Sequence, residues 1–517
     1  ILAQRSARKA HLDLSGELPG FSDDTAHIRN DPTWRVRPAP ARLRRRHVDI
    51  GDLAPCDTER FMRALRSPAQ GIQVDFDDGN CPTYYNQIKG IYNVYRAVRN
   101  QFHDTPPVSK APVLMLRPRA WNMVEHNMMV NGKEVPGPLF DFGLLMFHNG
   151  KLLFENNSGP FFYLSKVESY LEARLWSKIF LWTEQRLGLP PGSTKATVLI
   201  ENILATFEME EILYELREHS AGLNCGIWDY SASFVNNKYV NMEKRFLRSY
   251  MDLLVQTCHR RGALATGGMA ALLLPREKDG ALYRSVLAAV TRSKLLEINA
   301  GVDGFMVYDL DLVEPMQRVS GVPLYRSLRS PGVLALRSDP EADGTSWLRF
   351  PQLFQMRSRG ENQLLELRED VAVTPADLLS MPAGGVTLYG LKYNVAVGVL
   401  FIEAWLQGRG HFFYKGQVWQ WIRHLVTLED DGRAVTRALV RSLTTEVLAE
   451  LEDERRGHTP RERRTLLTSA RMFLEVVQKS DFPEFLTTYL NLDHTFLSSQ
   501  GRHADQQEEG GVLKHRL

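Results

Sequence analysis

The sequence predicts a (β/α)8 TIM barrel with an N-terminal arm and a C-terminal helical domain. Eight short, β-rich apolar runs follow one another, and segments of helical periodicity fill many of the gaps between them. The chain of 517 residues is long enough for one large domain with additions. The predicted parts are an arm at 1–65, a barrel at 66–312, an irregular insertion at 313–360, a helical domain at 361–497 and a polar tail at 498–517.

The strand–helix pattern carries the fold prediction. The predicted strands are 72–75, 113–116, 144–147, 161–164, 197–200, 222–225, 263–266 and 304–307, and the clearest predicted helices are 171–187, 204–219, 243–261 and 282–296. Eight such units favour a closed parallel barrel. The alternative is an open doubly wound sheet, which needs a glycine-rich phosphate loop after its first strand. Residues Val74–Asp78 are acidic instead.

The regions on either side of the predicted barrel differ from it in composition. Residues 1–65 are polar and proline-rich, which predicts an irregular arm with a short helical signal at 58–65. Residues 313–360 are rich in Pro, Ser, Gly and Arg, so we expect a surface excursion without catalytic groups.

The composition argues against nucleic-acid and membrane partners. Net charge is +2 at pH 7, which gives no strong basic field. The basic cluster Arg42–Arg46 is interpreted as solvated surface. The longest apolar stretch, Val395–Leu406, is shorter than a membrane helix and contains Glu403. The four cysteines form no C-x-x-C pair, as is typical of a reducing compartment. Protein partners stay undetermined.

Charged side chains follow the predicted strands at their carboxyl ends, where barrel enzymes place their chemistry. They are Asp75, Asp77, Asp78, Arg117, Arg119, Lys166, Glu201 and Asp229. Glu201 and Asp229 end neighbouring strands and can reach one ion, for which Mg²⁺ is the natural choice because it keeps waters and takes few protein oxygens. In the structural alternative, each carboxylate caps a helix or pairs with Arg119 or Lys166.

Several long motifs stand in a fixed order. They are Gly137–Gly143, Phe147–Asn149, Ser158–Lys166, Ala196–Glu201, Phe207–Leu213, His219–Tyr230, Cys258–Ala263 and Gly267–Ala271. Together they closely resemble malate synthase in its shorter form, which lacks the large inserted domain. The resemblance covers about residues 15–310 and, less densely, 360–455.

The resemblance implies a Claisen condensation of acetyl-CoA with glyoxylate, giving malate and CoA in the glyoxylate cycle. In the family, Mg²⁺ binds glyoxylate, an arginine stabilises the enolate of acetyl-CoA, and an aspartate from the C-terminal region removes a methyl proton. By motif, Glu201 and Asp229 match the metal ligands and Arg119 matches the catalytic arginine. Arg119 and the run Gly226, Ile227 and Trp228 are expected to contact substrate.

One departure from the family concerns the catalytic base. The flanking motifs Ile402–Trp405 and Trp419–Ile422 are present, but the family's intervening segment of about twenty residues with Met-Glu-Asp is not. Only His411–Val418 stands after the Gly-x-Gly turn, without a carboxylate, so the base is unknown. On the thioester side, the family's His-Asp-Gly and Ala-His-Pro are replaced around Val302 and Tyr308.

Three functions stay open at this stage. They are a working malate synthase, a weak or inactive relative with a structural or interaction role, and a related Mg²⁺-dependent CoA-thioester lyase or hydrolase. The compartment is expected to be peroxisomal or mitochondrial. The basic run Ile1–Lys9 resembles a transit-peptide remnant, and Lys514–Leu517 faintly resembles a peroxisomal signal.

Overall fold

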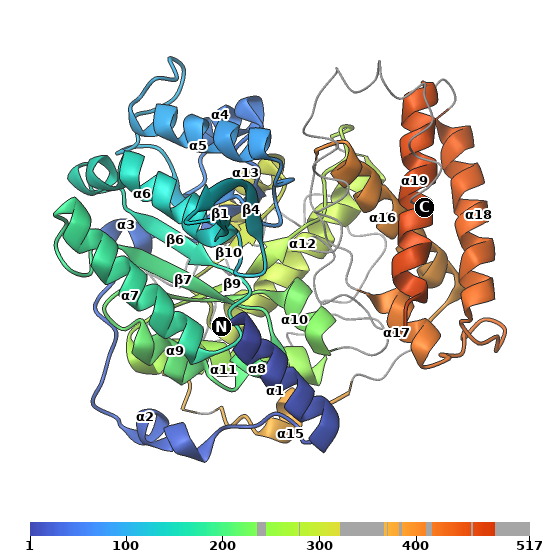
Figure 1. The fold of residues 1–517 in the computed structure, drawn as a ribbon, viewed down its shortest axis with the longest axis horizontal. Helices are drawn as coiled ribbons and strands as arrows, with labels where there is room; N and C mark the ends of the chain where they lie inside the picture. Colours follow the sequence, from blue (N-terminus) through green and yellow to red (C-terminus); the bar gives the residue numbers. More distant parts are fainter. Residues whose placement is uncertain are drawn as a thin grey trace.

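A closed barrel of eight parallel strands forms the centre of the computed structural model (Figure 1). The structure describes residues 1–234, 244–278, 280–320, 367–369, 371–381, 385–409, 416–455 and 459–480. The barrel strands, in spatial order, are β1 (Val48–Leu53), β10 (Gly304–Val307), β9 (Leu264–Ala270), β8 (Ser220–Cys225), β7 (Lys195–Ile200), β6 (Phe161–Leu164), β3 (Val113–Arg117) and β2 (Gly71–Asp75). The predicted fold class is therefore confirmed.

Two strand assignments need correction. The run Leu144–Phe147 is not a strand: it lies inside α6 (Gly137–Glu155), which buries Leu145 and Met146 at its centre. The missing strand is β1 (Val48–Leu53), which lies within the segment predicted as an arm. The barrel thus begins before residue 66, because β1 pairs with both β2 and β10.

Helices surround the barrel and follow its strands. They are α4 (Thr58–Arg66), α5 (Tyr84–Val98), α6 (Gly137–Glu155), α7 (Tyr170–Leu187), α8 (Ile203–Thr206), α9 (Met209–Glu215), α10 (Ile227–Phe234), α11 (Arg245–Arg261), α12 (Ala281–Ala300), the 3-10 helix η2 (Leu310–Leu312) and α13 (Val313–Ser320). An antiparallel hairpin of β4 (Val124–Val130) and β5 (Lys133–Pro136) interrupts the pattern between β3 and α6. No described helix is long and apolar enough to cross a membrane.

The N-terminal segment is more regular than predicted. It forms α1 (Leu2–Ser15), the 3-10 helix η1 (Asp23–Thr25), α2 (Ala26–Asn30) and α3 (Ala41–Arg44) before it enters β1. The buried Arg5 of α1 donates to Glu172 of α7, with Nε–Oε1 at 2.7 Å. This ion pair ties the first helix to the barrel wall.

The C-terminal helices form a second core beside the barrel (Figure 1). They are α16 (Leu388–Leu406), α17 (Gln417–Arg423), α18 (Arg437–Glu454) and α19 (Pro460–Gln478), preceded by the short α15 (Pro375–Leu378). The end of α16 lies against the loop between β2 and α5, because Cys81 Sγ of that loop donates to the Trp405 carbonyl at 3.6 Å. Just after α16, the Gly408 carbonyl accepts a hydrogen bond from Asn86 Nδ2, in the first turn of α5, at 2.9 Å. Most of the predicted insertion, residues 321–360, lies outside the described residues, whereas 313–320 form α13.

Candidate active site and metal centre

The loop after β2 carries three aspartates, and Asp75 shapes it. Its carboxylate accepts hydrogen bonds from the backbone N–H groups of Asp77 at 2.8 Å and Gly79 at 2.7 Å. A Cβ at Gly79 would stand 2.6 Å from Asp75 Oδ2, so only glycine fits this turn. The tight loop leaves Asp77 and Asp78 at the carboxyl end of the barrel, both buried.

Arg117 lies at the centre of these acids. Register pairs Asp75 with Arg117 across β2 and β3, so the two side chains leave neighbouring strands at the same level. Arg117 Nη1 contacts Asp52 at 3.1 Å and Asp75 at 3.0 Å, and Nη2 contacts Asp78 at 2.7 Å. One guanidinium therefore gathers carboxylates from the ends of β1 and β2.

Lys166 is the second cation of the site. Its Nζ lies 2.7 Å from both Asp77 Oδ2 and Asp78 Oδ2, and its backbone N–H donates to Glu201 Oε1. This dual use depends on a left-handed backbone at Lys166, with φ of 52°. Arg5 of α1 stabilises that conformation by donating from Nη2 to the Lys166 carbonyl at 2.6 Å.

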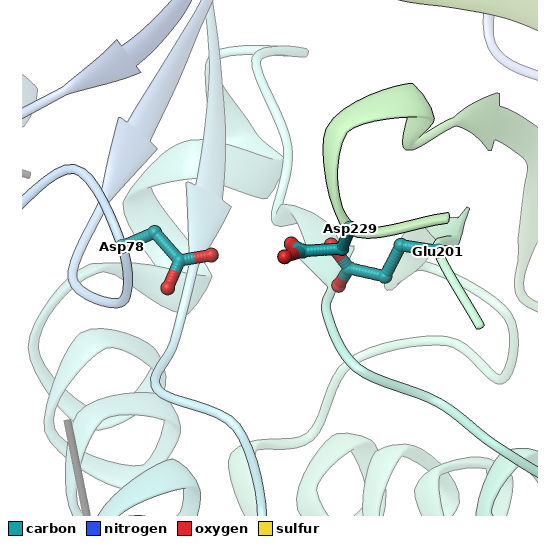
Figure 2. A group of neighbouring side chains, drawn as sticks. All are labelled: Asp78, Glu201 and Asp229. Carbon is teal, nitrogen blue, oxygen red and sulfur yellow. The ribbon is translucent and has the colours of Figure 1, made fainter. Parts of the chain in front are cut away.

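Three carboxylates face one point across the mouth of the barrel (Figure 2). Asp78 comes from the loop after β2, Glu201 follows β7 and Asp229 lies in the first turn of α10. Their ligand oxygens all lie within 4.8 Å of one another. The structure thus brings together the two acids that the sequence predicted as ligands. It adds Asp78, which the sequence placed on the rim without a role.

Gly226 allows Glu201 and the start of α10 to approach each other. A Cβ at Gly226 would lie 2.6 Å from the Glu201 Cβ. The next residues, Ile227 and Trp228, continue around the mouth, and Trp228 Nε1 donates to the Met269 carbonyl at 3.2 Å. Trp228 is nevertheless 45% exposed, so its ring borders the entrance instead of filling the core.

The electrostatics of the site favour an additional cation. Burial raises the pKa of the Glu201 carboxyl well above its usual range, and the nearby Asp229 raises it further. Burial also raises the pKa of Asp78, against the attraction of Lys166. Burial would raise the pKa of Asp77 too, but Lys166 and Arg117 outweigh it and leave that pKa below its usual value. A divalent ion beside Glu201 and Asp78 would relieve the repulsion.

The donor set fits Mg²⁺. It offers carboxylate oxygens only, and few of them, which leaves coordination positions for water and substrate. Thiol and imidazole ligands, which favour softer metals, are absent from this group of described residues.

Arg119 is held by two carboxylates outside the group of Asp78, Glu201 and Asp229. Its Nε and Nη2 bond the two oxygens of Asp141 at 3.0 and 2.9 Å, and its Nη1 bonds Glu125 at 3.0 Å. The carboxylate of Asp141, on α6, captures Arg119 outside the acidic cluster. The arginine that touches the rim acids is Arg117, two residues earlier. Sequence reasoning named Arg117 on the rim but gave it no role.

Among the described residues of the C-terminal helices, Glu403 of α16 is a buried carboxylate. Arg455 Nη1 binds both of its oxygens, at 3.1 and 2.9 Å. Residues 410–415, where the family's base segment would begin, lie outside the described residues.

Comparison with known proteins identifies the family. The family profile "Malate synthase, TIM barrel domain" matches residues 113–320, and "Malate synthase, C-terminal" matches 414–493. Malate synthase of Myxococcus xanthus is 38% identical over 505 residues, covering 91% of this chain and 86% of that protein. The chain belongs to the malate synthase family. Malate synthase A of Escherichia coli is 34% identical, covering 94% of this chain and 90% of that protein.

Further relatives carry the same family name. Malate synthases from Brassica napus and Candida tropicalis, 33% and 34% identical, are both named glyoxysomal. A solved Haloferax volcanii malate synthase in a magnesium/glyoxylate complex is 15% identical, with a TM-score of 0.35, over 49% of this chain and 68% of that one.

Proposed function

We propose that this protein is a malate synthase that condenses acetyl-CoA with glyoxylate in a Mg²⁺-dependent reaction, with low turnover. The observation that carries the proposal is the convergence of Asp78, Glu201 and Asp229 beside Arg117, in a chain of the malate synthase family. The glyoxysomal relatives support a peroxisome-type compartment.

The metal side of the proposed site offers three candidate ligands, Asp78, Glu201 and Asp229. Glu201 and Asp229 would hold Mg²⁺, with Asp78 either bound directly or through a water. When bound, the ion would polarise the aldehyde of glyoxylate and fix its orientation. Gly226 and the adjoining backbone of Ile227 would border the bound oxoacid, because they adjoin Glu201 at the mouth.

The positive charge needed for the carbon–carbon bond step would come from Arg117 in place of Arg119. The enolate of acetyl-CoA and the product alkoxide both carry negative charge, and a fixed guanidinium lowers the cost of forming them. Arg117 is buried and held by carboxylates on several sides, so it needs little reorganisation during the reaction. Lys166 would keep Asp77 ionised and Asp78 in place.

Proton removal from the methyl group is the weak step of the proposed reaction. The stretch His411–Val418 holds no Asp or Glu, and Arg455 occupies the carboxylate of Glu403. Loss of a general base typically costs about a hundred- to ten-thousandfold in rate. We therefore expect malate formation at least about a hundredfold below that of a complete family member.

The test is malate and CoA formation from acetyl-CoA, glyoxylate and Mg²⁺, with Escherichia coli malate synthase A assayed alongside. We expect slow malate formation that Asp229→Asn abolishes and that Glu155→Gln, an exposed change on α6, leaves intact. Turnover equal to the bacterial enzyme would overturn the weak-base proposal. Mg²⁺ and glyoxylate binding without any malate would instead favour a structural or interaction role.

A further inference from the structure

A second charged site lies at the opposite end of the barrel from the acids. A pocket of about 390 Å³ opens where β2 and β3 begin, at the N-terminal pole. Its walls are the region around α3, the turn from α4 into β2 and the loop before β3. The cationic residues that line it are Arg42, Arg45, Arg66 and Lys110. None of the described residues that line it is an Asp or a Glu.

Arg42 is the cation of this pocket whose side chain is fixed in place by hydrogen bonds. It is partly buried, and its guanidinium bonds only neutral groups: the carbonyls of Val108 at 3.0 Å and Ala111 at 2.5 Å, and Ser158 Oγ at 2.6 Å. Burial lowers the pKa of Arg42, and no carboxylate offsets that effect. A cation that has lost part of its hydration and has no anionic partner favours the binding of an anionic ligand.

Arg66 and Lys110 add exposed charge at the same opening. Within the described part of the chain, neither forms an ion pair, and the same holds for Arg42. Surface cations usually have carboxylates nearby, whereas this pocket concentrates charge of one sign. The sequence interpretation of Arg42–Arg46 as an ordinary solvated surface therefore does not account for the geometry.

We propose that this pocket binds a small molecule with a diphosphate group, at a site separate from the catalytic rim. Guanidinium groups match phosphate oxygens in geometry, and several converging cations favour a ligand with more charge than a single phosphate. The volume falls in the usual range for small-molecule sites. The pocket lies at the start of β2, and the metal-side acids lie beyond its end, so the two sites are expected to bind independently.

Calorimetry on the full chain with inorganic pyrophosphate, in EDTA without added metal, tests the proposal. We expect saturable binding at least about tenfold tighter than for orthophosphate or citrate. A failure to saturate below about 1 mM would overturn the site, because such binding is no stronger than a non-specific charge contact. Citrate binding as tightly as pyrophosphate would overturn the phosphate assignment.

Paired variants locate the binding. Because Arg42 also supports the loop before β3, the exposed pair Arg66→Glu and Lys110→Glu is the better test, and it should weaken pyrophosphate binding at least about tenfold. The matched control carries the same charge reversal at two exposed lysines elsewhere, Lys151→Glu on α6 and Lys178→Glu on α7. It should change the Kd for pyrophosphate less than twofold. Equal losses in both double variants would show a net-charge effect and overturn the pocket.

A last titration separates the two sources of a diphosphate. ADP that binds more tightly than pyrophosphate, and loses affinity in the Arg66→Glu/Lys110→Glu variant, identifies a nucleoside diphosphate. Weaker ADP binding, with pyrophosphate still sensitive to that variant, identifies the free diphosphate. The test stays independent of malate formation, because no metal or substrate is present.

Discussion

Asp52 and Lys166 hold backbone conformations that non-glycine residues avoid, with φ of 46° and 52°. Each such residue costs on the order of 1–3 kcal/mol and persists only where its surroundings enforce it. At both residues the ion pairs offset this cost: Asp52 contacts Arg117 at 3.1 Å, and Lys166 contacts Asp77 and Asp78 at 2.7 Å each. These two strained residues therefore lie where the rim acids are assembled.

Arg117 and Arg119 are expected to have different roles, the first catalytic and the second structural. Arg117→Lys removes the planar guanidinium from the acidic cluster and should lower kcat by roughly a hundredfold. Arg119→Lys breaks the bidentate contact with the buried Asp141, so it should instead lower the free energy of unfolding by about 1–3 kcal/mol. Turnover and thermal unfolding of both variants decide this, and a greater loss of turnover in Arg119→Lys would reverse the assignment.

Lys195, at the start of β7, should make stability depend on pH in the alkaline range. Burial lowers its pKa to about 8, and its Nζ donates to the Glu218 carbonyl at 2.7 Å. The unfolded chain keeps the ordinary, higher pKa, so it binds more protons than the folded protein above pH 8. Stability from this group therefore rises as the pH increases from about 8 to about 10.4, by on the order of 3 kcal/mol.

The measurement is urea unfolding across that pH range for the natural protein and for Lys195→Met. The variant lacks the titrating group, so its free energy of unfolding should gain less between the two limits. Parallel pH profiles for the two proteins would exclude the assigned role of Lys195.

At the level of individual residues, the spacing and the family motifs predict Glu201 and Asp229 as metal ligands, and the structure places their carboxylates close to that of Asp78. The motifs select Arg119 as the catalytic arginine, whereas the structure places Arg117 against the rim acids. Which arginine enters the barrel depends on Asp141 of α6, which bonds Arg119 through its backbone N–H as well as its guanidinium. That partner lies 22 residues away in sequence, where no local pattern reveals it.

Among the elements, the two wrong strand assignments have different physical origins. A continuous apolar run such as Leu144–Phe147 suits a buried strand and a buried helix equally, and only length decides. The 19 residues of α6 bury one face along its whole length. Strand β1 contains two acids, Asp49 and Asp52, that interrupt its apolar pattern and so hide it in the sequence. The strand can still be buried, because Arg46 pairs with Asp49 and Arg117 pairs with Asp52.

The shortened segment after α16 should limit turnover more than any other element. Replacing His411–Val418 with a family segment of about twenty residues that contains Met-Glu-Asp should raise malate formation by about a hundredfold or more. The end of α16 already lies against the loop that carries Asp78, through the contact of Cys81 Sγ with the Trp405 carbonyl, so the graft would begin close to that loop.

The matched control for the graft carries Asn in place of its Asp. It has the same length and nearly the same shape, and it should stay as slow as the natural chain. If the Asp and Asn grafts accelerate the reaction equally, the segment acts by excluding water and not by moving a proton.

For the whole molecule, the charge distribution couples metal binding to folding. Six carboxylates, Asp52, Asp75, Asp77, Asp78, Glu201 and Asp229, gather from the ends of β1, β2, β7 and β8, and two cations, Arg117 and Lys166, offset them. The unfolded chain separates these charges, so the folded barrel alone carries the cost of their repulsion. An ion that binds only the folded state therefore stabilises the whole barrel.

Mg²⁺ should raise the melting temperature of the natural protein relative to EDTA. At a hundredfold excess over the Kd, linkage gives about 2.7 kcal/mol, which corresponds to a shift of roughly 5–10 °C on the scale of 150–250-residue domains and less for a longer chain. Because the carboxyl pKa values of Glu201 and Asp78 are raised, Mg²⁺ must displace protons, and the shift should shrink as the pH falls. Glu201→Gln should abolish the shift, whereas Glu155→Gln should preserve it. An equal shift in both variants would place the stabilising ion elsewhere and reject Glu201 as a ligand.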